Sequence, residues 1–184
     1  MSYVWEGESG SVEISLNGQP RHITTNLALA LRRLRKKHEH RTLWIDALSI
    51  DQSNDVEKSH QVGLMGEIYR RCVRVYLWMG DYCNGLDCSL DTRIVEETSE
   101  LLLGNNRGIC RESHQDKGFA AFSVIHDLAE GRHLNELSCC MGAVPNLGPF
   151  EELIQKPWWD RIWIVQEIAL PPDAIVIYGP MQMP

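Results

Sequence analysis

The chain has 184 residues, a hydrophobic content of 43% and a formal net charge of −7 at pH 7. These values fit one globular domain with a buried core. The acidic balance argues against binding to nucleic acid or to an anionic membrane, because both attract basic surfaces. No apolar run approaches the roughly 18 residues of a membrane-spanning helix, and no signal peptide precedes the first strand, so a cytoplasmic location is expected.

The cysteines are expected to be unpaired thiols, because an intracellular chain keeps its thiols reduced. They are Cys72, Cys83, Cys88, Cys110, Cys139 and Cys140. None of them has the CxxC spacing that is typical of a zinc site. Neither a bound metal nor a resident cofactor is therefore expected.

The first predicted elements are a strand, a hairpin and a helix. Ser2–Trp5 is predicted to be a strand that the start of the chain shortens. Val12–Ile14 and the Asn17-Gly18 turn predict a small hairpin. Thr25 or Asn26 can cap a helix that extends to about Lys37.

The next predicted elements alternate between strand and helix. Thr42–Leu48 is apolar and predicts a strand, and Val73–Met79 predicts another. Between them lie a polar loop and an amphipathic helix, Val56–Arg71, which Asn54 or Asp55 can cap. This βαβ alternation predicts that Leu43–Leu48 and Val73–Met79 lie parallel in one sheet.

Residues 81–148 are predicted to be an insertion of helices and loops. Ile94–Leu103 and Phe119–Glu130 are its expected helices. After it, Pro157 opens a helix to about Leu170, and Ala174–Tyr178 adds another strand to the sheet. The expected fold is a single three-layer α/β domain over residues 1–184, with a mostly parallel sheet flanked by helices.

The helix after the insertion carries a candidate functional carboxylate. Between Trp158 and Leu170 only Asp160, Arg161, Gln166 and Glu167 are polar, so the helix is expected to be buried nearly all round. A buried carboxylate such as Glu167 needs a partner or a chemical role. One interpretation is a structural salt bridge, for example with Arg161. The other is a functional group at the carboxyl ends of the strands, where open α/β sheets bind ligands.

The same two interpretations apply to residues near the other strand ends. Asp46 and Asp51 follow or end a predicted strand, and their alternative role is local turn and cap chemistry. Tyr3 and Trp5 lie on one side of the first strand and can form the wall of a pocket for a flat ligand. Their alternative role is that of ordinary core aromatics.

Three segments together resemble a known family. They are Ser2–Gly7, Leu43–Asn54 and Arg161–Glu167. These segments resemble the opening, central and closing motifs of the fungal heterokaryon-incompatibility (HET) domain. The resemblance implies an effector domain of fungal non-self recognition that triggers regulated cell death, through self-association or an activating receptor-type partner. It also implies a core distantly similar to that of TIR domains.

The likeness to TIR domains implies a specific chemistry. Some TIR domains cleave NAD with a glutamate a few residues after a tryptophan, and Glu167 and Trp163 resemble that pair. Glu167 is then the expected catalytic residue, because cleavage of the nicotinamide–ribose bond passes through a cationic sugar that a carboxylate stabilises. The remaining expected substrate-binding residues are Tyr3, Trp5, Asp46, Asp51, Gln52 and Trp163. Two alternatives stay open, a non-catalytic interaction domain and a nucleotide-binding regulator.

Overall fold

A mixed four-stranded sheet lies at the centre of the chain. The structure, a computed structural model, describes residues 1–5, 10–81, 115–133, 147–179 and 181–184. The sheet has the order β1-β4-β5-β6, with bounds β1 Ser2–Tyr3, β4 Val75–Trp78, β5 Ala174–Tyr178 and β6 Met181–Met183. Strands β1, β4 and β5 are parallel, whereas β6 pairs antiparallel with β5. The mostly parallel α/β sheet is therefore confirmed, and β6 is an addition that the sequence analysis missed.

A separate hairpin and the first helix follow β1. Strands β2 (Ser11–Leu16) and β3 (Gln19–Thr24) are antiparallel, as predicted. Asn17 and Gly18 have φ values of 53° and 76°, which suit the tight turn of a two-residue hairpin. Helix α1 (Thr25–Leu34) is capped by Thr24, whose hydroxyl accepts a hydrogen bond from the Leu27 amide at 3.2 Å. The helix was correctly predicted, with ends that differ by one to three residues.

The strand predicted over residues 42–48 is wrong. Residues 42–45 have no regular secondary structure, and α2 (Asp46–Ser49) is a single helical turn. The amides of Leu48 and Ser49 donate to the Ile45 carbonyl at 2.9 and 2.8 Å, and Asp46 Oδ1 accepts from the Ala47 amide at 2.9 Å. These short-range bonds hold the backbone in a turn and compete with strand pairing. The neighbours of β4 are instead β1 and β5.

Helix α3 (Asp55–Arg71) agrees closely with its prediction. Asn54 caps it, and its side-chain oxygen accepts hydrogen bonds from the amides of Val56 and Glu57, both at 3.1 Å. Met65 and Tyr69, one turn apart, turn the buried face of the helix toward the sheet. Tyr69 is thereby placed next to β1 and α7.

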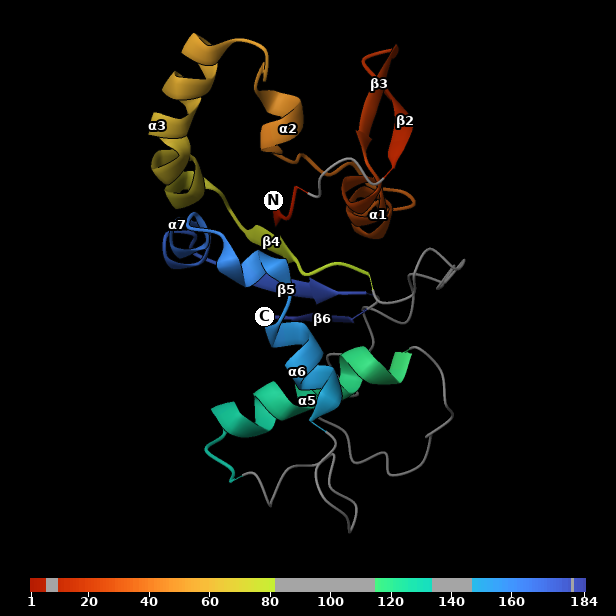
Figure 1. Ribbon diagram of the computed structural model, residues 1–184, viewed down its shortest axis with the longest axis vertical. Coiled ribbons are helices and arrows are strands. Elements are labelled where there is room, and N and C mark those ends of the chain that lie inside the picture. Colours follow the sequence, from red (N-terminus) through yellow and green to blue (C-terminus); the bar gives the residue numbers. More distant parts are fainter. Residues whose placement is uncertain (6–9, 82–114, 134–146, 180) are drawn as a thin grey trace.

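Two hydrophobic cores lie on opposite faces of the sheet, so the domain has three layers. Val75, Leu77 and Met79 pack into one core with α3, α5 (Gln115–Ala129) and α6 (Gly148–Ile154). Trp78 packs into the other core with Tyr3 and α1. Alternate residues of β4 thus serve opposite faces, as strand geometry requires. Figure 1 shows the hairpin beside α1, and α5 with α6 beyond β6.

The region predicted to be an insertion is described in part. Helix α5 matches the predicted Phe119–Glu130 helix, but it begins earlier, at Gln115, and ends one residue earlier, at Ala129. The predicted Ile94–Leu103 helix lies outside the described residues, as do all of the cysteines except Cys72, which is a free thiol. In the part of the chain that is described, no helix is both long enough and apolar enough to cross a membrane.

The continuous helix predicted over Pro157–Leu170 is broken. A 3-10 turn, η2 (Pro157–Asp160), is followed by extended backbone at Arg161 (φ −80°, ψ 128°) and then by α7 (Ile164–Ala169). The β-branched residues in this stretch weaken its helix propensity. The all-round burial expected here is also wrong, since the side chains of Ile162 and Val165 are 83% and 70% exposed.

Candidate functional site

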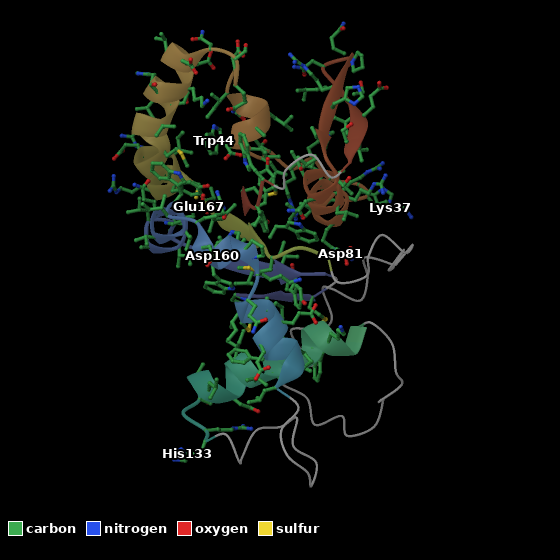
Figure 2. The ribbon with its side chains drawn as sticks, in the orientation of Figure 1. Lys37, Trp44, Asp81, His133, Asp160 and Glu167 are labelled. Carbon is green, nitrogen blue, oxygen red and sulfur yellow. The ribbon has the colours of Figure 1, made fainter. Side chains whose placement is uncertain are left out.

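Glu167 lies where α7 meets α3 and β1, and it is only 1% exposed. Figure 2 shows it between the helices, on the side of the sheet that α7 covers. Strand β1 contributes Ser2 to this position, because Ser2 and Tyr3 point to opposite faces of the strand. The predicted proximity of Glu167 to the first strand is therefore confirmed for Ser2.

The Glu167 carboxylate is saturated with hydrogen bonds. Arg161 binds it with two nitrogens, Nη1 to Oε2 at 3.0 Å and Nη2 to Oε1 at 3.1 Å. The Tyr69 hydroxyl donates to Oε1 at 3.3 Å, and the Ser2 hydroxyl donates to Oε2. A two-pronged arginine contact is the strongest ion-pair geometry available to a carboxylate. We call Ser2, Tyr69, Trp158, Arg161 and Glu167 the Glu167 network.

Trp158 completes this network from η2. Its Nε1 donates to Ser2 Oγ at 2.7 Å, while Ser2 in turn donates to Glu167. Burial, followed by the nearby charge of Glu167, raises the pKa of Tyr69, so its hydroxyl stays protonated and can donate. A buried charge of this kind is tolerated because the polar atoms that contact it are themselves hydrogen-bonded to it or to one another.

The Glu167 carboxylate is enclosed by its hydrogen-bond partners, so it faces protein atoms and not solvent. The hollow described in the structure, of about 550 Å³, lies at the ends of β1 and β4 and is lined by Val4, Asn26 and Gly80 among others, but not by Glu167. Figure 2 shows Glu167 beside α7, away from Asp81 at the end of β4. The physical reason is the Arg161 backbone, which turns the guanidinium back over the carboxylate and closes it off from solvent.

The geometry brings the three motif segments to one place. Ser2 and Arg161 both contact Glu167, and Trp44 packs edge-on against Tyr69, with ring centroids 6.2 Å apart. The model of the heterokaryon incompatibility protein (HET) family matches residues 1–167 of the 184. The chain belongs to the HET family.

One curated relative supports the same assignment. The heterokaryon incompatibility protein 6, OR allele, of Neurospora crassa is 27% identical over 198 residues. The alignment covers 97% of this HET domain and 28% of that protein, so the chain spans about a quarter of the length of its relative. No solved structure matches the chain.

Three of the predicted substrate-binding residues form a second group on the HET domain. Trp5 Nε1 donates to Asp46 Oδ1 at 3.3 Å, and Gln52 Nε2 donates to the Asp46 backbone carbonyl at 3.1 Å. Burial raises the pKa of the Asp46 carboxyl, although its bonds from Ala47 and Trp5 act in the opposite direction. Asp46 is thus a half-buried carboxylate beside a half-exposed tryptophan, but it is not bonded to Glu167.

The remaining predicted residues are dispersed. Tyr3 is buried in the α1 core, and burial raises the pKa of its hydroxyl. Asp51 is exposed and accepts hydrogen bonds from the Ser53 amide and hydroxyl at 3.0 and 2.6 Å, which is turn chemistry. Trp163 is partly exposed, and its backbone carbonyl accepts from the Glu167 amide at 3.1 Å.

Sequence reasoning missed the partners that enclose Glu167. Ser2, Tyr69 and Trp158 were not singled out, although Arg161 was named as a salt-bridge candidate. A weak signal was present in each case. Ser2 is a small polar residue within a strand, and Tyr69 and Trp158 are aromatics with polar atoms, which usually find a hydrogen-bond partner when they are buried.

Asparagine at position 46 should stabilise the domain at neutral pH. Because the folded-state pKa of Asp46 is raised, the stability that this group contributes is fully present below the ordinary carboxyl pKa and is lost as pH rises through the raised value. Asp46→Asn keeps an acceptor oxygen for Ala47 and Trp5 without the charge. Thermal melts should therefore show a higher midpoint for the variant than for the wild type at about pH 7. The difference between the two midpoints should become smaller toward about pH 4.

Asp51→Asn is the matched control for this experiment. The hydrogen bonds from Ser53 lower the pKa of Asp51, so the same substitution should not stabilise the domain there. If the wild type were more stable than Asp46→Asn at neutral pH, this result would contradict the raised pKa of Asp46.

Proposed function

We propose that this HET domain is an effector of fungal non-self recognition that signals regulated cell death by associating with a second copy of itself, without catalysis by Glu167. The observation that carries the proposal is the orientation of the segment around α7. The Glu167 carboxylate points inward and is enclosed, whereas the apolar side chains of the segment point outward. We call these exposed residues the α7 apolar surface: Ile162, Trp163, Val165 and Ile168.

The Glu167 network explains how this orientation is maintained. Arg161 and Glu167 hold the two ends of the segment together through paired hydrogen bonds, and Ser2 and Tyr69 attach it to β1 and α3. The segment between them can only turn its apolar side chains to solvent. Four large apolar side chains close together on a surface are typical of an interaction site.

A second copy is the simplest occupant of such a surface. In a two-fold dimer the same patch contacts itself, so one apolar surface is sufficient for both partners. Apolar side chains can also pack against the same side chains of a second copy, whereas a charged surface would need a partner of opposite charge.

Val165→Glu tests this proposal. Val165 is 70% exposed, so the substitution should leave the fold intact while placing a charge at the centre of the α7 apolar surface. Sedimentation velocity over a range of concentrations should show a wild-type dimer and a monomeric variant. We expect the dissociation constant to rise by at least about tenfold, because a buried unpaired carboxylate is costly.

Val73→Glu is the matched control. Val73 is 90% exposed at the turn before β4, outside the α7 apolar surface, and it undergoes the same chemical change. It should dimerise as the wild type does. A wild-type protein that stays monomeric at all concentrations would refute self-association, as would equal effects at the two positions.

Cleavage of NAD through Glu167 is the second candidate function. It is favoured by the clustering of a carboxylate, two hydroxyl groups and Trp158 at the motif that resembles the TIR pair. The mechanism would require Arg161 to release Glu167, so that the carboxylate could reach the ribose and stabilise its positive charge. Nicotinamide leaves from a cation, so no proton donor is needed.

The assay for this candidate uses the purified wild-type domain and Glu167→Gln with NAD. Release of nicotinamide by the wild type and none by the variant would support catalysis. An absence of nicotinamide from a folded wild type that dimerises would leave association as the function. The two candidates are therefore separated by turnover and by oligomeric state, which are independent measurements.

A further inference from the structure

The hollow described above lies beyond the ends of β1 and β4, beside α1. The N-terminal ammonium of Met1 donates to the Trp44 carbonyl at 2.8 Å and joins the start of β1 to the segment before α2. Trp44 and Ile45 contribute to the two cores on opposite faces of the sheet.

In open α/β sheets, ligands bind in the crevice outside the carboxyl ends of the strands. The hollow occupies the corresponding place here, because Val4 follows β1 and Gly80 and Asp81 follow β4. Its volume of about 550 Å³ is within the roughly 300–1,000 Å³ of small-molecule sites.

The wall of the hollow is held by buried hydrogen bonds. Asn26 Oδ1 accepts from Trp78 Nε1 at 2.7 Å, and Asn26 Nδ2 donates to the Val4 carbonyl at 3.0 Å. These bonds tie α1 to both strands that end at the hollow. The site is therefore preformed, which limits the entropy that a ligand must overcome on binding.

The charges that line the hollow fit an anion with hydroxyl groups. Arg32 and Lys156 both line it, and among the described residues no carboxylate forms an ion pair with Arg32. Lys156 lies over the Tyr178 ring, 5.2 Å from its centroid, and 3.9 Å from a Glu152 oxygen. Asp81 also lines the hollow, and a carboxylate can accept hydrogen bonds from ribose hydroxyl groups.

We propose that this hollow binds a nucleotide, with its phosphates on Arg32 and Lys156 and its ribose toward Asp81. Leu29, Met79 and Pro157 supply the apolar wall that a base needs. Arg32 lies seven positions after Thr25 on α1, which separates the two ends of the wall by about 10 Å, enough for a nucleoside and its phosphates. The site is separate from the Glu167 network and from the α7 apolar surface.

Binding of ATP and of NAD to the purified domain tests the proposal, with titration calorimetry as the readout. At least one of the two nucleotides should bind saturably. Arg32→Gln and Lys156→Gln should each weaken that binding by about tenfold, because each removes a charge-assisted contact to phosphate. Arg32→Lys should retain most of the affinity, since it keeps the charge.

Arg33→Gln is the matched control, because Arg33 is the next residue on α1 and does not line the hollow. The affinity of the Arg33→Gln variant for the nucleotide should stay within about twofold of the wild-type value. The proposal is overturned if neither nucleotide binds, or if Arg33→Gln weakens binding as much as Arg32→Gln. Pyrophosphate that binds as tightly as the nucleotide would also overturn it, because the apolar wall would then contribute nothing. None of these readouts depends on dimerisation or on nicotinamide release.

Discussion

Replacing Glu167 with glutamine should lower the free energy of unfolding by about 3–5 kcal/mol, the usual cost of removing one member of a buried ion pair. The side chain keeps its shape, so the loss reports on charge and hydrogen bonding. Arg161 would keep its positive charge in a site where its side chain is only 20% exposed. An amide group would also present donors to the hydroxyls of Ser2 and Tyr69, which now donate to the carboxylate. Chemical denaturation followed by circular dichroism measures the change.

Glu67→Gln is the control for this prediction. Glu67 also binds arginines, Arg70 and Arg71, but this cluster lies on the exposed surface of α3. Its loss should cost no more than about 1 kcal/mol, since solvent screens exposed pairs. A loss of similar size at the two positions would mean that burial does not strengthen the Glu167 network.

Truncating Trp158 to alanine should lower the free energy of unfolding by about 3–5 kcal/mol, as for other large core side chains. Trp158 is 0% exposed, and its ring packs edge-on against Trp159 with centroids 5.0 Å apart. Its removal leaves a cavity beneath the sheet and deprives Ser2 Oγ of a hydrogen-bond donor. Denaturant titration should show a lower midpoint with an unchanged slope.

The adjacent Trp159→Ala provides the comparison for this variant. Trp159 is 41% exposed and donates from Nε1 to the Leu153 carbonyl at 3.0 Å. Its truncation should cost clearly less, since much of the ring already contacts water. If both substitutions lowered the free energy of unfolding equally, this result would contradict the prediction that the buried Trp158 contributes more than the exposed Trp159.

Patterns of apolar and capping residues predicted most of the regular elements. The Asn17-Gly18 turn indicated the hairpin, and Asn54 indicated the start of α3. Both signals depend on bonds within a few residues, so they can be read from a short stretch of sequence. The strands β4 and β5 were predicted because fully buried parallel strands are nearly continuous apolar runs.

The two errors of element assignment have a common cause. Residues 42–48 and 157–170 are mostly apolar, and periodicity alone cannot tell a buried strand from a turn or a broken helix in such runs. What decided them were individual hydrogen bonds, namely those to the Ile45 carbonyl and those between Arg161 and Glu167. Such bonds depend on the local backbone conformation and on side-chain direction, which a sequence pattern does not specify.

The candidate site was predicted in part for a related reason. The sequence showed that Glu167 was a carboxylate in an apolar environment, and Arg161 was considered as its partner. The contributions of Ser2 and Tyr69 could not be foreseen, because they come from 165 and 98 residues away along the chain. The hollow near Arg32 was also missed, since it is formed by segments that no motif joins.

The contact between Ser2 and Glu167 has a consequence for synthesis of the protein in the cell. Ser2 is synthesised 165 residues before its partner. At about 5–20 residues per second, the first strand waits on the order of ten to thirty seconds for the helix that holds it. Until β4 has been synthesised, the backbone of β1 also lacks the strand that it pairs with. A nascent-chain chaperone that shields this segment should therefore raise the yield of folded protein, and slow translation of the last third should lower it.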